Sequence, residues 1–212
     1  MSTGCGAPVL SPADVPDPTG APGDGWRPAP RRGDPLADVR VRPAGRGDLP
    51  GLVALVKRCS PDTLYRRFHG ASGTPLQREL GRVAEPGTDH RSWVAVTGRC
   101  VRGTATLAWG RWGEVEVAFL VEDAWIRRGV GRALFRAVAR AARRANLPDV
   151  VAWVQADNDR AVRFLRDVAP GAEVRFAGGG ELKVTIPVPS PLASLAPLPP
   201  PASAPRRPAP AA

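Results

Sequence analysis

The sequence has little lysine, little histidine and few cysteines. Lys57 and Lys183 are the only lysines among its 30 basic residues, and the chain holds 3 Cys and 2 His. The cysteines are odd in number and widely spaced, which excludes a disulfide framework and a cysteine-rich metal cluster. The histidines, His69 and His90, are isolated from each other. We therefore expect no metal site.

The sequence also lacks long apolar runs. No run approaches the length of about 18 residues that a membrane-spanning helix needs. Neither end has the basic segment followed by an apolar one that marks a secretory signal. We therefore expect a soluble, cytoplasmic protein, either a monomer or a homodimer, with no membrane partner.

The two ends of the chain have little to bury. Residues 1–37 are crowded with Pro, Gly, Ala and Asp, and residues 188–212 are nearly all Pro, Ala and Ser. Such segments cannot form a packed core, so both are predicted to be disordered. Residues 38–187 remain as one domain of about 150 residues, a common domain size.

The net charge of +10 raises the question of a nucleic-acid partner. The arginines are scattered along the whole domain rather than gathered in one block, and no nucleic-acid motif is present. We expect no specific nucleic-acid partner, and look instead for a local polyanion site.

Residues 114–146 predict a strand, a glycine-bearing turn and an amphipathic helix. Apolar residues alternate along the strand at Val115, Val117, Phe119 and Val121. Gly129 and Gly131 follow, and their missing side chains let an anion approach the backbone. The helix has one apolar face, formed by Leu134, Val138, Ala141, Ala142 and Ala145, and an arginine ridge, formed by Arg132, Arg136, Arg140 and Arg144.

The first turn of such a helix offers unpaired N–H groups and the positive end of the helix dipole, so it suits a phosphate. A plain strand-to-helix connection with a solvated arginine face is the alternative.

The stretch Val121-Glu122-Asp123-Ala124-Trp125-Ile126-Arg127-Arg128-Gly129-Val130-Gly131 resembles the acyl-CoA-binding signature of the GNAT acyltransferase superfamily. Ile126 replaces the usual Gln or Arg of that signature. The resemblance implies that backbone groups at the end of the strand hold the pantetheine arm, at Phe119, Leu120 and Val121. It implies that the loop holds the pyrophosphate, at Arg127, Arg128, Gly129, Val130, Gly131 and Arg132.

A second element, Asn158 to Leu165, is similar to the family pattern N-x-x-A-x-x-L-Y. Leu165 stands where the family usually carries a tyrosine that protonates the leaving thiolate. A thiol with a pKa of about 8.5 leaves fairly well without that proton. Asn158 is implied to contact the coenzyme, with helix capping as the alternative.

A third element, Ser60-Pro61-Asp62-Thr63-Leu64-Tyr65-Arg66-Arg67-Phe68, resembles a run found in the GNAT branch that includes bacterial protein-lysine acetyltransferases. It makes Tyr65, Arg67 and Phe68 candidate substrate residues. Core packing is the alternative for Phe68.

Acetyl transfer to an amine needs a base, because a lysine-like amine with a pKa of about 10.4 is protonated at neutral pH. Glu116 matches the position of a glutamate base in one branch of the superfamily, and Glu114 lies on the same strand face. A solvated strand face is the alternative for both. Asp89 and Glu122 are the other carboxylates expected to attract a cationic acceptor.

The pattern predicts an α+β fold of the GNAT type, with a mixed central sheet of about six to seven strands and about four to five helices. Strands are expected at 38–43, 92–96, 100–109, 114–121, 150–155, 173–176 and 181–186. Helices are expected after the caps Asp48, Ser60, Thr74 and Asn158, and after Gly129.

The function predicted from this resemblance is an N-acetyltransferase that moves an acetyl group from acetyl-CoA to an amine, without a metal. A protein lysine is favoured slightly over a small-molecule amine as the acceptor. A non-catalytic CoA-sensing or interaction module is the remaining alternative.

Overall fold

The computed structural model describes four stretches of the chain: residues 39–68, 74–85, 87–110 and 113–188. Several expectations lie outside these residues: the disorder of 1–37 and of nearly all of 188–212, and the position of His69.

Strands and helices follow one another in the predicted order. The strands are β1 (Arg40–Pro43), β2 (His90–Thr97), β3 (Cys100–Trp109), β4 (Val115–Val121), β5 (Asp149–Gln155), β6 (Glu173–Gly178) and β7 (Glu181–Pro187). The α-helices are α1 (Leu49–Arg58), α2 (Pro61–Phe68), α3 (Thr74–Ala84), α4 (Val130–Arg144) and α5 (Asp159–Val168). Two short 3-10 helices are η2 (Arg46–Asp48) and η3 (Asp123–Trp125).

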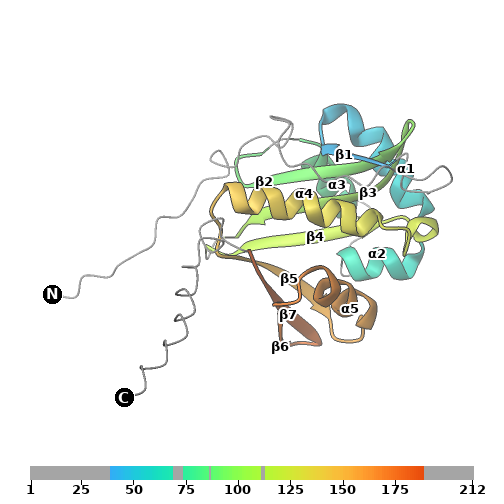
Figure 1. Cartoon of the computed structure of the whole chain (residues 1–212). Helices are drawn as coiled ribbons and strands as arrows, with labels where there is room; N and C mark the ends of the chain where they lie inside the picture. The colour runs from blue at the N-terminus through green and yellow to red at the C-terminus, as the bar shows by residue number, and fades with distance from the viewer. Residues whose placement is uncertain (1–38, 69–73, 86, 111–112, 189–212) are drawn as a thin grey trace, which may run out of the picture.

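The seven strands form one mixed sheet in the order β1-β2-β3-β4-β5-β7-β6. Neighbouring strands are antiparallel except β4 and β5, which are parallel. α4 connects this parallel pair and lies over β2, β3 and β4, while β5, β7 and β6 turn away from β4 (Figure 1). The predicted α+β class and the GNAT-type mixed sheet are confirmed.

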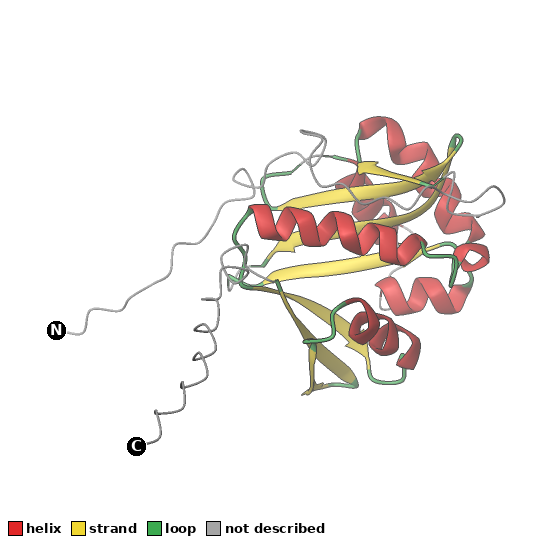
Figure 2. Cartoon of the chain, viewed as in Figure 1, coloured by secondary structure: helices red, strands yellow, loops and turns green. Residues whose placement is uncertain are grey.

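Helices cover the sheet on both faces, and each face has its own core (Figure 2). α4 and α5 pack over one cluster, which includes Val117, Leu134 and Ile186. α1 and α3 pack over a second cluster, which includes Leu52 and Leu120. As described, this second cluster contains no residue of β5, β6 or β7.

The predicted apolar face of α4 is confirmed, since its five residues are all buried. The four arginines of the predicted ridge are exposed. Burial lowers the pKa of Arg140, and repulsion from Arg144, Arg136 and Arg143 lowers it further. No helix in the described part of the chain is long and apolar enough to cross a membrane.

One predicted cap is wrong. Asp48 stands at the N-cap position of α1, but its side chain makes no capping hydrogen bond. Its carboxylate instead accepts two hydrogen bonds from Arg42, at 2.6 and 2.7 Å, and one from the Gly45 N–H. The bonds from Arg42 hold the pKa of Asp48 below its ordinary value, although burial opposes the shift. The charged guanidinium of Arg42 is a stronger donor than the N–H groups of the helix, so the Asp48 carboxylate binds Arg42 instead of capping α1.

Candidate active site

The parallel strands β4 and β5 diverge soon after the position at which they pair. β4 pairs with β3 along its whole length, from Val115 to Val121. The described pairing with β5 consists of Glu116 opposite Val151 alone. Beyond that point a cavity of about 610 Å³ opens between the C-terminal half of β4, the start of α4, and α5. On the β4 side it is lined by Phe119, Leu120 and Val121. The predicted pantetheine residues therefore form one wall of a cavity.

The first turn of α4 forms the next wall. Gly129, the N-cap, has a left-handed backbone with φ of 82°, and no side chain caps the helix. Its first N–H groups have no partner within the helix, and they carry the positive end of the dipole. Gly131 follows at the cavity wall, where a Cβ atom would lie 3.3 Å from the ring of Phe164. Both glycines keep the backbone of this turn accessible to an anion.

Arginines dominate the charged lining of the cavity. Six of them face it: Arg66, Arg67, Arg127, Arg132, Arg160 and Arg163. Asp167 of α5 is the only acidic residue in the described lining, and it is already ion-paired with Arg132. The cavity therefore suits a polyanionic ligand, because a concave site lined by one sign of charge concentrates the field.

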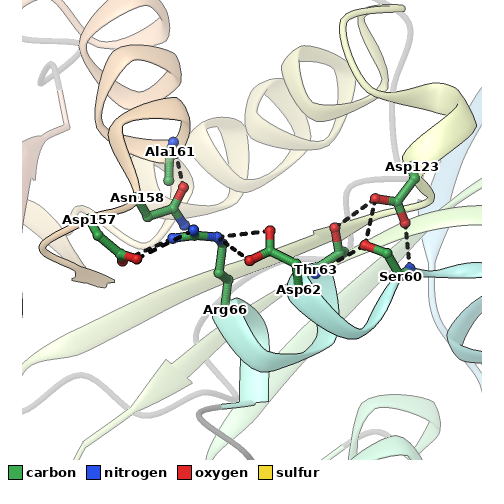
Figure 3. A network of polar contacts seen from close by, with 8 residues as sticks. All are labelled: Ser60, Asp62, Thr63, Arg66, Asp123, Asp157, Asn158 and Ala161. Carbon is green, nitrogen blue, oxygen red and sulfur yellow. Dashed lines mark hydrogen bonds and ion pairs between the residues drawn. The ribbon is translucent and has the colours of Figure 1, made fainter.

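Asp123, the first residue of η3, anchors α2 beside the cavity. Its carboxylate accepts hydrogen bonds from the Ser60 N–H at 2.7 Å, the Ser60 hydroxyl at 3.0 Å and the Thr63 hydroxyl at 2.8 Å (Figure 3). Burial raises the pKa of Asp123, but these hydrogen bonds outweigh it and leave the pKa below its ordinary value. Ser60 also accepts from the Thr63 N–H at 3.2 Å, so its predicted capping role is confirmed.

Arg66 links the two sides of the cavity. Its guanidinium donates to Asp62 on its own helix at 3.0 Å and to Asp157, just before α5, at 2.9 Å (Figure 3). Asn158 follows, lines the cavity and accepts a hydrogen bond from the Ala161 N–H at 3.1 Å. The capping alternative for Asn158 is therefore present, and its position also suits a contact with a bound ligand.

Arg67 lies deeper than Arg66. Its side chain is 16% exposed, faces the cavity and lies 3.7 Å from Glu79. Burial lowers the pKa of Arg67, while the negative charges of Glu79 and Glu116 act to raise it. Glu116 is itself exposed and belongs to the same sheet face as Leu120. Arg67 thus lines the cavity and also interacts electrostatically with the predicted base.

Three acidic residues that were expected to serve an acceptor are held in ion pairs: Glu114, Glu122 and Asp89. Glu114 forms an ion pair with Lys183 of β7. Glu122, expected to attract an acceptor, is instead buried and held by Arg58 and Arg102, each at 3.0 Å. Asp89 is likewise engaged, by Arg82 and His90. Of the acidic residues expected to act as base or to attract an acceptor, Glu114 and Glu116 are exposed at the start of β4.

The remaining candidate residues occupy varied positions. Tyr65 is 57% exposed, and Phe68 packs against the α1–α3 cluster. Arg128 lies over the ring of Trp125, and the Val130 side chain is fully buried, so of Val130 only the backbone can face a ligand. Leu165, in the tyrosine position, is 2% exposed and belongs to the core.

Sequence reasoning missed several cavity residues. Phe164 of α5 lines the cavity and meets Phe119 edge-on, with ring centroids 5.9 Å apart. Trp125 also lines it. The position of Phe164 within the α5 motif was an available signal. By contrast, Arg66 of α2 and Arg160 and Arg163 of α5 are recognised as cavity residues only once the two helices are placed in the fold.

The cysteines offer no alternative nucleophile in this region. Cys59 is buried, and burial together with the charges of Asp123 and Glu122 raises its pKa to about 12. Such a thiol is protonated at neutral pH and unreactive. In the described residues no group of three or more His, Cys, Asp or Glu side chains is arranged to hold a metal ion.

Comparison with known proteins supports the same family. A model described as the acetyltransferase (GNAT) family matches residues 60–168. No curated protein matches the sequence. The chain is similar to the GNAT domain of S. lividans PAT, with 25% identity and a TM-score of 0.64, over 70% of this chain and 90% of that one.

Two further solved structures share the fold. YncA from Salmonella typhimurium, a putative acetyltransferase solved with acetyl-CoA, has 16% identity and a TM-score of 0.56, over 72% of this chain and 95% of that one. The PaiA N-acetyltransferase from Thermoplasma acidophilum, solved with coenzyme A, has 12% identity and a TM-score of 0.55, over 70% of this chain and 98% of that one. Since the family model covers more than half of the sequence and the fold agrees, the chain belongs to the GNAT family of acetyltransferases.

Proposed function

We propose that this protein transfers an acetyl group from acetyl-CoA to a primary amine, with Glu116 as the general base. The observation that carries the proposal is the cavity itself. It joins the uncapped first turn of α4 to the region just beyond Glu116, where β4 and β5 diverge.

The coenzyme is proposed to lie with its pyrophosphate at the first turn of α4. The N–H groups of Gly129 to Arg132 supply donors and the dipole supplies positive potential. Arg127 and Arg132 line the cavity beside this turn and add charge. The pantetheine arm would run along Phe119 to Val121, where β4 has an edge that β5 does not cover in the described pairing. The acetyl-CoA and coenzyme A in the two fold relatives support this choice of ligand.

The acceptor amine is proposed to approach on the Glu116 side. The Glu116 carboxylate takes a proton from the ammonium directly or through a water molecule, and the free amine attacks the thioester carbon. The carbon–sulfur bond breaks, and the thiolate receives the second proton of the nitrogen. Because Leu165 is packed in the core, no side chain acid is assigned to the thiolate.

A protein lysine is proposed as the acceptor, ahead of a small-molecule amine. The resemblance of the Ser60 to Phe68 element to protein-lysine acetyltransferases supports it. The exposed position of Tyr65 and the solvent-facing position of Glu116 suit an acceptor that arrives on a larger surface.

Two measurements on the full-length chain test the proposal. Calorimetric titration should detect acetyl-CoA binding with one site per chain. A thiol-release assay with a lysine-containing peptide should then show turnover that is lost in Glu116→Gln. Absence of acetyl-CoA binding would overturn the proposal; binding with equal turnover in Glu116→Gln would overturn the assignment of the base.

A further inference from the structure

Lys183, one of the two lysines of the chain, occupies an unusual position. It belongs to β7, and its ammonium forms an ion pair with Glu114. The same ammonium lies 5.8 Å from the ring centroid of Trp153 on β5, within the range of a cation–π contact. The Lys183 side chain is 31% exposed. A primary amine is thus held on the sheet by one carboxylate and one aromatic ring.

The strand register puts this amine on the same face of the sheet as the proposed base. Glu116 is paired with Val151, and Trp153 is paired with Lys183. Side chains two residues apart on a strand share a face, so Glu114, Glu116, Val151, Trp153 and Lys183 all belong to one face of the sheet. Glu114 precedes Glu116 by two residues, and Trp153 follows Val151 by two.

An ammonium that contacts Glu114 and also lies over Trp153 lies on the face of the sheet that carries the Glu116–Val151 pair. The α1–α3 cluster, as described, does not extend over the half of this face that β5, β6 and β7 form. The Glu116–Val151 pair is also the point at which β4 and β5 diverge and beyond which the cavity opens.

We propose that Lys183 is an acetyl acceptor within its own chain. The inference rests on the proposed function, because the thioester must reach the region of Glu116. The Glu116 carboxylate takes a proton from the Lys183 ammonium, and the nitrogen lone pair forms a bond to the thioester carbon. The carbon–sulfur bond breaks with its electron pair on sulfur, and the thiolate takes the second proton of the nitrogen. The products are Nζ-acetyl-lysine, coenzyme A and one proton.

The modification removes a positive charge from the acceptor side of the site. An acetylated Lys183 can form neither the ion pair with Glu114 nor the cation–π contact with Trp153. Glu114 is then available to a cationic acceptor. Acetylation of Lys183 would thus convert a self-occupied amine site into one open to an external amine.

The small number of lysines gives a clean test. The full-length chain is incubated with acetyl-CoA, and acetyl groups are located by peptide mass spectrometry in wild type, Lys183→Arg and Lys57→Arg. Lys57, exposed on α1, is the matched control because chemical acetylation by acetyl-CoA would reach it freely. The mapping also separates lysine acetylation from any modification of the amino terminus.

The expected result is acetylation of Lys183 at least about tenfold faster than Lys57, a difference of about 1.4 kcal/mol in barrier. This preference should disappear in urea, and the rate per chain should not depend on protein concentration. Equal rates at the two lysines, or a rate that rises with protein concentration, would overturn the inference.

Calorimetry on the same samples separates this inference from the proposed function. If acetyl-CoA binds and an external peptide is acetylated while Lys183 stays unmodified, the inference on Lys183 fails and the proposed function stands. If acetyl-CoA does not bind, the proposed function fails. Lys183→Arg preserves the charge, so it should bind acetyl-CoA as wild type does.

Discussion

The two ends of β4 have opposite chemical surroundings. Beyond its C-terminal end lie a helix N-terminus and six arginines around a cavity. At its N-terminal end lie Glu114 and Glu116, with the only lysine of the sheet held against Glu114. A polyanion is favoured at one end and a cation at the other. A strand of 7 residues thus has an anion-favouring end and a cation-favouring end on opposite sides of the point where β4 and β5 diverge.

The first change tests the end of β4 that faces the cavity. Gly131→Leu should weaken acetyl-CoA binding by at least about 100-fold, or about 2.7 kcal/mol. A Cβ atom added at Gly131 would lie 3.3 Å from the Phe164 ring. The leucine side chain must therefore enter the cavity or displace Phe164. Calorimetry measures the change. Gly81→Leu on α3 is the matched control, since a Cβ at Gly81 meets nothing within 4 Å. Equal affinities of the two variants would refute the placement of the ligand.

A second change tests the acidic end. Glu116→Gln should lower kcat by about 10² to 10⁴-fold, as loss of a general base does, and leave acetyl-CoA affinity unchanged. Steady-state kinetics with calorimetry separate the two quantities. Glu173→Gln, an exposed carboxylate on β6, serves as the control. A parallel loss of affinity and turnover in Glu116→Gln would mean that the two ends of β4 are not separate sites.

A third change tests the contact that fixes α2 beside both ends. Asp123→Asn should destabilise the fold by about 2 kcal/mol, because an amide presents its own N–H group to donors at Ser60 and Thr63. Denaturant unfolding measures the change. Asp149→Asn on β5, an exposed position, is the control.

The same variant has a predicted pH signature. The folded-state pKa of Asp123 lies below its unfolded value of about 3.9, so its contribution is present above that value and is lost as pH falls through the folded pKa. Below that range the stabilities of wild type and Asp123→Asn should converge. A constant gap between them down to strongly acidic pH would contradict the assignment.

The smallest expected effect concerns salt. Raising ionic strength from about 0.1 M to about 1 M shortens the screening length from about 10 Å to about 3 Å. Acetyl-CoA binding should weaken several-fold, since part of the arginine field acts through solvent. Affinity that is independent of salt would show that the arginines contribute little and that backbone contacts dominate.

Much of this architecture could be predicted from local sequence. The alternation at Val115 to Val121, the glycines of the turn and the apolar face of α4 are periodic signals, and the elements they predict are present. Ser60 and Asn158 cap helices as their positions indicate. These features depend on neighbours within one or two helical turns, which a single sequence displays.

The failures involve side chains that compete for one carboxylate. Asp48 was expected to cap α1, yet its carboxylate is bound by Arg42. Glu122 was expected to face an acceptor, yet Arg58 and Arg102 bury it in an ion-pair cluster. The contact of Lys183 with Glu114 joins residues 69 apart in sequence. Competition between several partners for one charged group leaves no periodic pattern in the sequence. It can therefore be recognised only when the fold is known.

The most direct test of the opposite-ends account is a crystal structure of the full-length chain with coenzyme A. The account predicts pyrophosphate oxygens within hydrogen-bonding distance of the N–H groups in the first turn of α4, and the thiol between β4 and β5 beside Glu116. A pyrophosphate bound elsewhere, or a thiol that points away from the Glu116–Val151 pair, would contradict it.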